Sequence, residues 1–316
     1  MNVSSTNVTV VVNYRDSYTK AVTKNVIVVA IGISINFINA SLIHTFRKHQ
    51  VFNMNPRYIL FIHLVVNDMI QLMLTVFLFI LSYTMYTLHV SLCCTIVLIT
   101  LFTTENTPLN LACMAVECYI AICLPLHCTQ ICTVKRTYLL IVLIWVTSMT
   151  SVLPDLFITL AIEPQEFFHS KVFCLRHNVF PSPHLTKKKN ACYVVFLVIV
   201  WFILFYTYFR ILFTAKAAKK DAKKARNTIL LHGFQMLLCM TIYVGPMFTP
   251  VLKKWSPENY VDSLFACYII IQILPRSISP IIYGLRDKKL RSYLRRYLTC
   301  KVTITIHPQT IFKRPL

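Results

Sequence analysis

Seven long apolar segments constrain the fold of this chain more than any other feature of its sequence. Each is long enough to cross the hydrocarbon core of a bilayer as a helix, which takes about 20 mostly apolar residues. We expect membrane-spanning helices over residues 26–46, 58–82, 93–123, 138–162, 191–213, 228–252 and 262–284. The predicted fold class is therefore an all-α membrane protein, a bundle of seven transmembrane helices.

The composition agrees with a membrane protein. Hydrophobic residues make up 56% of the chain and charged residues 14%, against about 45–50% and about 25% in soluble domains. Residues 1–16 are polar and lack the apolar core of a cleavable signal peptide, so we expect the first span to act as the signal-anchor. We expect an extracellular N-terminus at 1–25, the helical domain at 26–284 and a cytoplasmic helix and tail at 285–316.

The distribution of charge predicts the orientation. The net charge is +21, but the basic residues lie between and after the apolar segments and not along a soluble face, which argues against nucleic-acid binding. With the N-terminus outside, 21 of the 32 Lys and Arg residues fall on the cytoplasmic side, as the positive-inside rule requires. Glycosylation sequons at Asn2 and Asn7 lie in the same outer segment.

An amphipathic helix is predicted after the seventh span. Leucine and tyrosine recur at helical spacing between residues 290 and 298, with basic residues between them. This pattern indicates a helix that lies on the inner membrane surface and contacts membrane lipid. Cys300 at its end is a candidate for acylation, although its spacing alone does not decide this.

The most informative motif is MAVECYIAICLPLH, residues 114–127, at the inner end of the third apolar segment. It places Glu117 and Tyr119 on either side of Cys118, followed by an apolar turn ending in Pro125-Leu126. This arrangement resembles the cytoplasmic end of the third span in rhodopsin-like (class A) G-protein-coupled receptors. The flanking residues are most similar to the odorant-receptor branch, and to fish odorant receptors in particular.

Four further patterns in the expected order strengthen the resemblance. They are Asn36 in the first span, Asn67-Asp68 in the second, Lys224, Thr228 and His232 at the start of the sixth, and Pro280 to Tyr283 at the end of the seventh. The resemblance implies a plasma-membrane receptor of olfactory neuron cilia that binds a small waterborne odorant. It further implies activation of a heterotrimeric G-protein, usually the olfactory stimulatory type, with no catalysis and no cofactor or metal.

The resemblance also implies a disulfide between Cys93, at the start of the third span, and Cys174, in the long second outer loop. Such a bridge would hold that loop over the ligand pocket. Cys94 is an adjacent competitor for the same partner.

The resemblance places a ligand pocket along one face of the third span. Leu101, Thr104 and Glu105 share that face because they are three and four residues apart. Glu105 either binds a cationic ligand group or is hydrogen-bonded within the bundle, and the basic second outer loop favours an anionic ligand instead. We expect the pocket to be completed by Met240, Tyr243 and Gln272.

Two ionisable residues within the spans are candidates for a polar switch. Asp68 and Arg276 are costly in a bilayer and therefore expected to be functional. We hypothesise that they pair, although Asp68 could face a sodium ion and Arg276 could face Glu105. The predicted polar core consists of Asn36, Asp68, Arg276, Pro280 and Tyr283.

One residue departs from the family pattern, because Cys118 stands where relatives have an arginine. A thiol is only a weak donor and cannot replace a rigid, charged guanidinium. Glu117 therefore lacks its usual partner, a role that Lys224 or Arg226 could fill. Either coupling survives or the receptor signals weakly or not at all. The predicted G-protein interface comprises Glu117, Cys118, Tyr119, Pro125, Leu126, Lys224, Thr228 and His232.

Two other functions are weighed against this one. A transporter or channel is disfavoured because the sequence has no internal repeat and few charges within its spans. A metal site is disfavoured because the cysteines at 118, 123, 128 and 132 fit no common zinc spacing.

Overall fold

The structure is a computed structural model, in which the description covers two long stretches and a number of shorter ones. The described residues are 17–85, 87–172, 174, 176–181, 183–217, 230, 233, 234, 237, 238, 241, 252, 254, 255, 259–278, 280 and 292. Most of the predicted sixth span, the end of the seventh and the predicted tail helix lie outside them.

Long helices cover six of the seven predicted spans. They are α2 (Tyr18–Lys48), α4 (Pro56–Thr84), α5 (Val90–Cys123), α7 (Val134–Ile162), α10 (Pro183–Ala217) and α12 (Tyr260–Tyr268), which continues into a π-helical turn η1 (Ile269–Ile273). Among the described residues, five helices are long and apolar enough to cross a membrane by length and composition. These are α2, α4, α5, α7 and the helix that runs from Tyr260 to Ile278.

Short elements connect the long helices. At one end of the bundle lie β1 (Leu88–His89), β2 (Lys171–Val172), α8 (Gln165–His169) and α9 (Arg176–Val179), and at the other lie α3 (Gln50–Asn53) and α6 (Pro125–Ile131). β1 and β2 pair antiparallel, with Leu88 opposite Val172. In the predicted orientation the first end is the outer one and the second is the cytoplasmic one.

Local capping explains where several helices begin. The side chain of Ser17 accepts a hydrogen bond from the backbone N–H of Lys20 at the start of α2. Asn55 caps α4 in the same way through the N–H of Arg57, and Pro56 occupies the first helical position, where its missing N–H costs nothing. Thr133 caps α7. The bundle helices therefore extend beyond their apolar segments to the capping residues.

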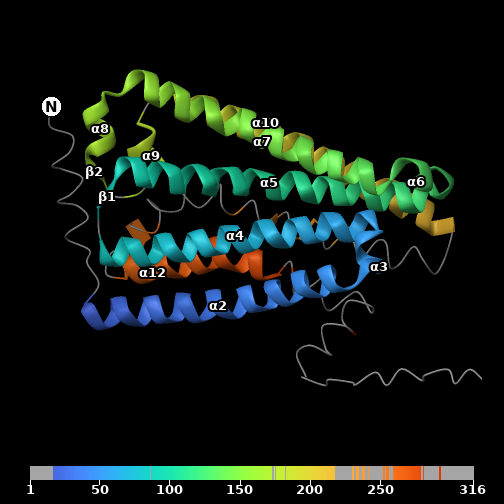
Figure 1. Cartoon of the computed structure of the whole chain (residues 1–316), viewed down its shortest axis with the longest axis horizontal. Coiled ribbons are helices and arrows are strands. Elements are labelled where there is room, and N and C mark those ends of the chain that lie inside the picture. The colour runs from blue at the N-terminus through green and yellow to red at the C-terminus, as the bar shows by residue number, and fades with distance from the viewer. Residues whose placement is uncertain are drawn as a thin grey trace, which may run out of the picture.

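Helix α5 lies in the middle of the bundle. Figure 1 shows the long helices running side by side, with α5 between α4 on one side and α7 and α10 on the other. Helix α2 packs against α4, and α12 lies near both of them. The third span is thus the element that contacts most of the bundle.

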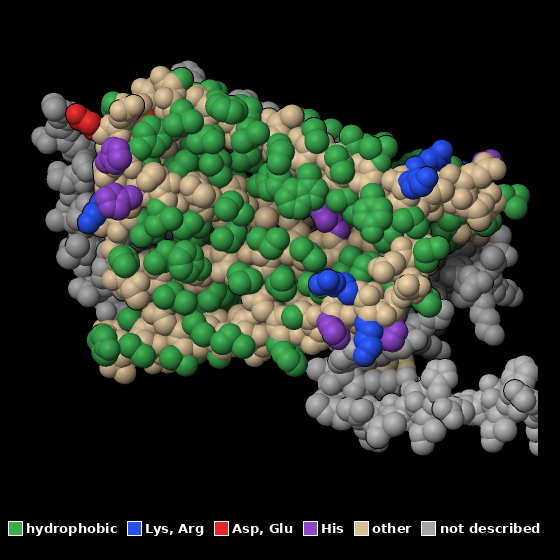
Figure 2. All heavy atoms as spheres, in the orientation of Figure 1, with side chains coloured by type: hydrophobic (Ala, Val, Ile, Leu, Met, Phe, Trp, Pro, Cys, Tyr) green, Lys and Arg blue, Asp and Glu red, His purple; other side chains and the backbone are tan. Residues whose placement is uncertain are grey.

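The bundle surface is apolar over the length of its helices. Figure 2 shows hydrophobic side chains covering the visible face, with most charged and histidine side chains near the two ends. Large apolar side chains such as Phe202, Phe157 and Ile33 are more than three-fifths exposed. A contiguous apolar surface of this extent marks a membrane-embedded protein.

Polar contacts inside the bundle hold α4, α5 and α7 in register. Asn67 Nδ2 donates to the carbonyl of Thr103 at 2.8 Å and to Thr107 Oγ1 at 3.1 Å. Asn110 Nδ2 donates to the carbonyl of Leu60 at 3.0 Å. Ser148 Oγ of α7 donates to Asn106 at 2.6 Å. In lipid, where apolar burial between helices gives little driving force, such hydrogen bonds contribute to helix association.

Candidate functional site

The second outer loop is attached to the outer end of the bundle. Cys93, in the first turn of α5, forms the predicted disulfide with Cys174, with their Cα atoms 5.6 Å apart, while Cys94 keeps a free thiol. Val179 and Phe180 of the loop are buried against this bridge. The loop is therefore held at the outer end of α5.

A second attachment of this loop is an ion pair that sequence analysis missed. Arg176 Nη2 of α9 lies 2.9 Å from Asp155 Oδ2 of α7, and the Asp155 side chain is only 6% exposed. Burial lowers the pKa of the Arg176 guanidinium, and the nearby Asp155 carboxylate partly offsets this effect. A single acidic residue in the apolar segment 138–162 was the signal that could have found it.

The three predicted pocket residues of α5 contact different neighbours. Leu101 packs against the cluster around the disulfide. Thr104 accepts a hydrogen bond from Gln71 of α4, whereas Glu105 accepts one from Ser151 of α7 at 3.2 Å. The predicted pocket face therefore spreads from α4 to α7. A Ser151 contact agrees with the interpretation in which Glu105 is hydrogen-bonded within the bundle.

The other predicted pocket residues lie on the sixth and seventh spans. Gln272 is in the π-helical turn of the seventh, and its carbonyl accepts a hydrogen bond from Arg276 Nη1. Met240 and Tyr243 lie outside the described residues.

The candidate switch residues are buried in the bundle. Asp68 is 2% exposed and Arg276 is 3% exposed, and Asn36 is half-buried in α2. Pro280 is buried and Tyr283 lies outside the described residues. An ion pair between Asp68 and Arg276 stays a prediction.

At the cytoplasmic end, Glu117 has a partner that the sequence analysis did not name. Arg57 Nε, in the first turn of α4, lies 2.9 Å from Glu117 Oε2. The carboxylate side chain is 12% exposed and the arginine side chain 41%. Lys224 and Arg226, the partners suggested from sequence, lie outside the described residues, as do Thr228 and His232.

Cys118 points into the bundle. It is 2% exposed and belongs to a cluster with Ile211 and Tyr208 of α10 and with its neighbour Tyr119. Two residues of the predicted interface lie beyond it on α6, where Pro125 begins the helix and Leu126 is 85% exposed. The thiol is thus part of the packing between α5 and α10, whereas the Leu126 side chain is exposed.

Apolar helices, a disulfide from the third span to an outer loop and a buried polar core together define a helical membrane protein. The chain belongs to the 7 transmembrane receptor (rhodopsin) family, whose sequence profile matches residues 38–283. The predicted resemblance to rhodopsin-like receptors is confirmed. Membership implies a multi-pass plasma-membrane protein whose partner classes are a small-molecule ligand and a G-protein.

Similar proteins include several chemosensory receptors. Odorant receptor 131-2 of Danio rerio is 28% identical over 281 residues, which cover 87% of this chain and 86% of that protein. Olfactory receptor 1D2 of Homo sapiens is 28% identical over 217 residues, 64% of each chain. Olfactory receptor 5H19 of Mus musculus is 30% identical over 210 residues, covering 60% of this chain and 62% of that protein.

Proposed function

We propose that this chain is an odorant receptor that binds a small waterborne odorant and activates a heterotrimeric G-protein. The observation that carries the proposal is the similarity to the Danio rerio odorant receptor, which extends over 87% of the chain and so includes both ends of the bundle. The N-terminus is outside, and by resemblance the receptor resides in the cilia of olfactory neurons.

The odorant binds in the outer half of the bundle, below the second outer loop. Two attachments support this location, because the disulfide at Cys174 and the ion pair at Arg176 hold the loop at the outer ends of α5 and α7. Leu101, Thr104 and Glu105 lie on α5 at that end, and Met240, Tyr243 and Gln272 complete the proposed site.

The cytoplasmic end contacts the G-protein, which we take to be the olfactory stimulatory type. Ligand binding shifts the receptor toward a signalling state only as far as the ligand binds that state more tightly. In this chain Arg57 supplies the guanidinium that faces Glu117, so the carboxylate is neutralised although the family arginine is replaced by Cys118. Exposed Leu126 of α6 supports a contact with the G-protein in the same region.

A second candidate is a receptor of the same fold without G-protein output. Burial of Cys118 against α10 supports it, because a buried thiol offers the G-protein neither charge nor a strong donor. The two candidates differ in one observable, which is agonist-dependent signalling.

The experiment is a cAMP assay in cells that express the chain with the olfactory stimulatory G-protein. Wild type and Cys118→Arg are matched for surface expression and exposed to a mixture of amino acids, short amines and short carboxylic acids. A wild-type response supports the odorant receptor with intact coupling. A response limited to Cys118→Arg supports the second candidate.

A further inference from the structure

A cavity of about 500 Å³ lies in the cytoplasmic half of the bundle, away from the proposed odorant site. Helices α5, α7 and α10 form its walls, and residues of α4 and α6 reach its inner end. Its volume falls within the range of about 300–1,000 Å³ that small-molecule sites occupy. Most of its lining residues are aliphatic, for example Leu109, Leu140, Ile199 and Ile203.

The cavity has the length of one lipid leaflet. On α7 it extends from Arg136 to Thr147, and on α5 from Leu109 to Ile120. Each wall is therefore about 16 Å long at 1.5 Å per helical residue. Half of the hydrocarbon core of a bilayer is about 15 Å thick, so the cavity matches a single extended acyl chain of the inner leaflet.

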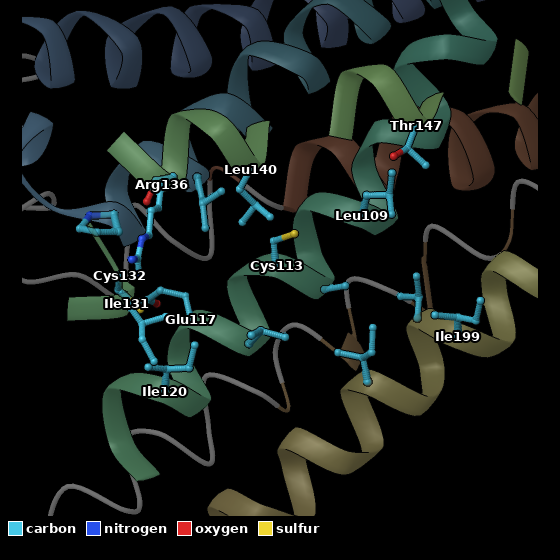
Figure 3. A pocket seen from close by; sticks show the side chains of 17 residues that line it. Leu109, Cys113, Glu117, Ile120, Ile131, Cys132, Arg136, Leu140, Thr147 and Ile199 are labelled. Atoms are coloured by element: carbon cyan, nitrogen blue, oxygen red, sulfur yellow. The ribbon is translucent and has the colours of Figure 1, made fainter. Parts of the chain in front are cut away.

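The charged side chains of the lining are confined to the cytoplasmic end of the cavity. Figure 3 shows Arg136, Cys132 and Glu117 together at one end, and Thr147, Leu109 and Ile199 toward the other. Glu117 is paired with Arg57 at 2.9 Å, so its charge is compensated. Arg136 donates from Nη1 to the carbonyl of Gln130 at 2.9 Å, and its guanidinium carries further donors suited to a carboxylate.

We propose that this cavity binds a long-chain fatty acid from the inner leaflet, with its carboxylate at Arg136 and its chain between α5, α7 and α10. The cavity offers one cation, Arg136, to a lipid headgroup and has room for one acyl chain. It therefore suits a single-chain lipid with one negative charge better than a two-chain phospholipid. Glu117 forms part of the wall and also pairs with Arg57, so the bound lipid contacts the residue that links α4 to α5 at the cytoplasmic end. Fatty acid binding stabilises this arrangement by mass action.

The test uses the full chain in nanodiscs of neutral phosphatidylcholine and a palmitate analogue with a diazirine near its terminal methyl group. After irradiation, the labelled peptides are identified by mass spectrometry. We expect saturable labelling near Thr147, Leu109 and Ile199, where the chain ends. Palmitate should compete for this labelling, whereas hexadecanol should compete about tenfold less well because it lacks the charge.

Two pairs of variants separate the site from general lipid contact. Arg136→Gln should weaken competition by palmitate about tenfold, whereas Lys135→Gln removes the adjacent exposed charge and should leave it unchanged. Thr147→Trp fills the far end of the cavity and should abolish labelling there, whereas Thr150→Trp should retain it. Thr147 and Thr150 are exposed and their hydroxyls bond only backbone carbonyls of α7 in the described structure, so both variants should fold.

The proposal is overturned by labelling that does not saturate, by equal labelling of Thr147→Trp and wild type, or by an anionic phospholipid that displaces the probe when palmitate does not. None of these readouts depends on odorants or on G-protein, so the result is independent of the proposed function.

Discussion

Removing Arg176 should destabilise the receptor, because it leaves the Asp155 carboxylate buried without its guanidinium partner. The Asp155 side chain is 6% exposed and that of Arg176 is 27% exposed. Breaking a buried ion pair by deleting one partner costs about 3–5 kcal/mol. Because water reaches a quarter of Arg176, we take the lower value, about 3 kcal/mol. At about 2 °C per kcal/mol for a large domain, Arg176→Gln should lower the unfolding midpoint by about 6 °C.

The opposite deletion should be milder. In Asp155→Asn the amide oxygen still accepts a hydrogen bond from Arg176, and the partly exposed guanidinium keeps some water, so we expect a loss of about 1 kcal/mol. The double variant Arg176→Gln with Asp155→Asn should recover most of the stability lost in Arg176→Gln alone. The double variant should then lie about 1 kcal/mol below wild type, so the pair has a coupling energy of about 3 kcal/mol, which a double-mutant cycle measures directly.

The assay heats purified receptor in detergent and measures the folded fraction by size-exclusion chromatography. Lys171→Gln is the matched control, since it removes an exposed cation from the same loop, and its midpoint should stay within about 1 °C of wild type. Equal midpoints for Arg176→Gln and Lys171→Gln, or strictly additive effects in the cycle, would refute the reasoning.

Three further predictions concern other parts of the bundle. Arg57→Gln removes the partner of the Glu117 carboxylate and should raise basal nucleotide exchange on the G-protein about two- to fivefold. This range follows because a partly exposed ion pair stabilises the inactive arrangement by up to about 1 kcal/mol. Unchanged exchange at equal surface expression would contradict this. Asn67→Leu loses two interhelical hydrogen bonds and should lower the unfolding midpoint by about 2–4 °C, at about 1–2 kcal/mol for the two; an unchanged midpoint would show that they contribute nothing. Burial and the neighbouring Cys128 raise the pKa of the Cys132 thiol to about 12. The rate of Cys132 alkylation, measured by peptide mass spectrometry, should therefore be low at neutral pH and rise about tenfold per pH unit. A rate that reaches a plateau below about pH 10 would contradict the raised pKa.

The transmembrane helices could be predicted because bilayer thickness sets the length of an apolar segment. The third helix ends at Cys123 as predicted, since the Leu124-Pro125 break follows it. The first helix instead begins at Tyr18, ahead of the predicted start at residue 26. A hydropathy pattern does not detect the polar first turns of this helix. A tertiary contact supports these turns, since Lys24 Nζ lies 2.6 Å from Asp262 Oδ1 of the last described span.

Residues of the candidate site could be predicted only at positions where the family resemblance implied a role. The disulfide came from that resemblance and is confirmed. The pairs Arg57–Glu117 and Asp155–Arg176 join residues 60 and 21 positions apart, and one chain's local spacing does not encode such contacts. A polar stripe was available in the sequence, however, because positions 103, 106, 107 and 110 recur at helical spacing in an apolar span and all face the bundle interior.

The most direct test of the account is nucleotide exchange by purified wild-type receptor reconstituted with the olfactory stimulatory G-protein. Binding of GTPγS is measured with and without the mixture of amino acids, short amines and short carboxylic acids, with Cys118→Arg run in parallel. The account predicts that the mixture stimulates exchange in wild type, with Cys118 in place and Arg57 facing Glu117. A silent wild type beside a responsive Cys118→Arg would contradict it.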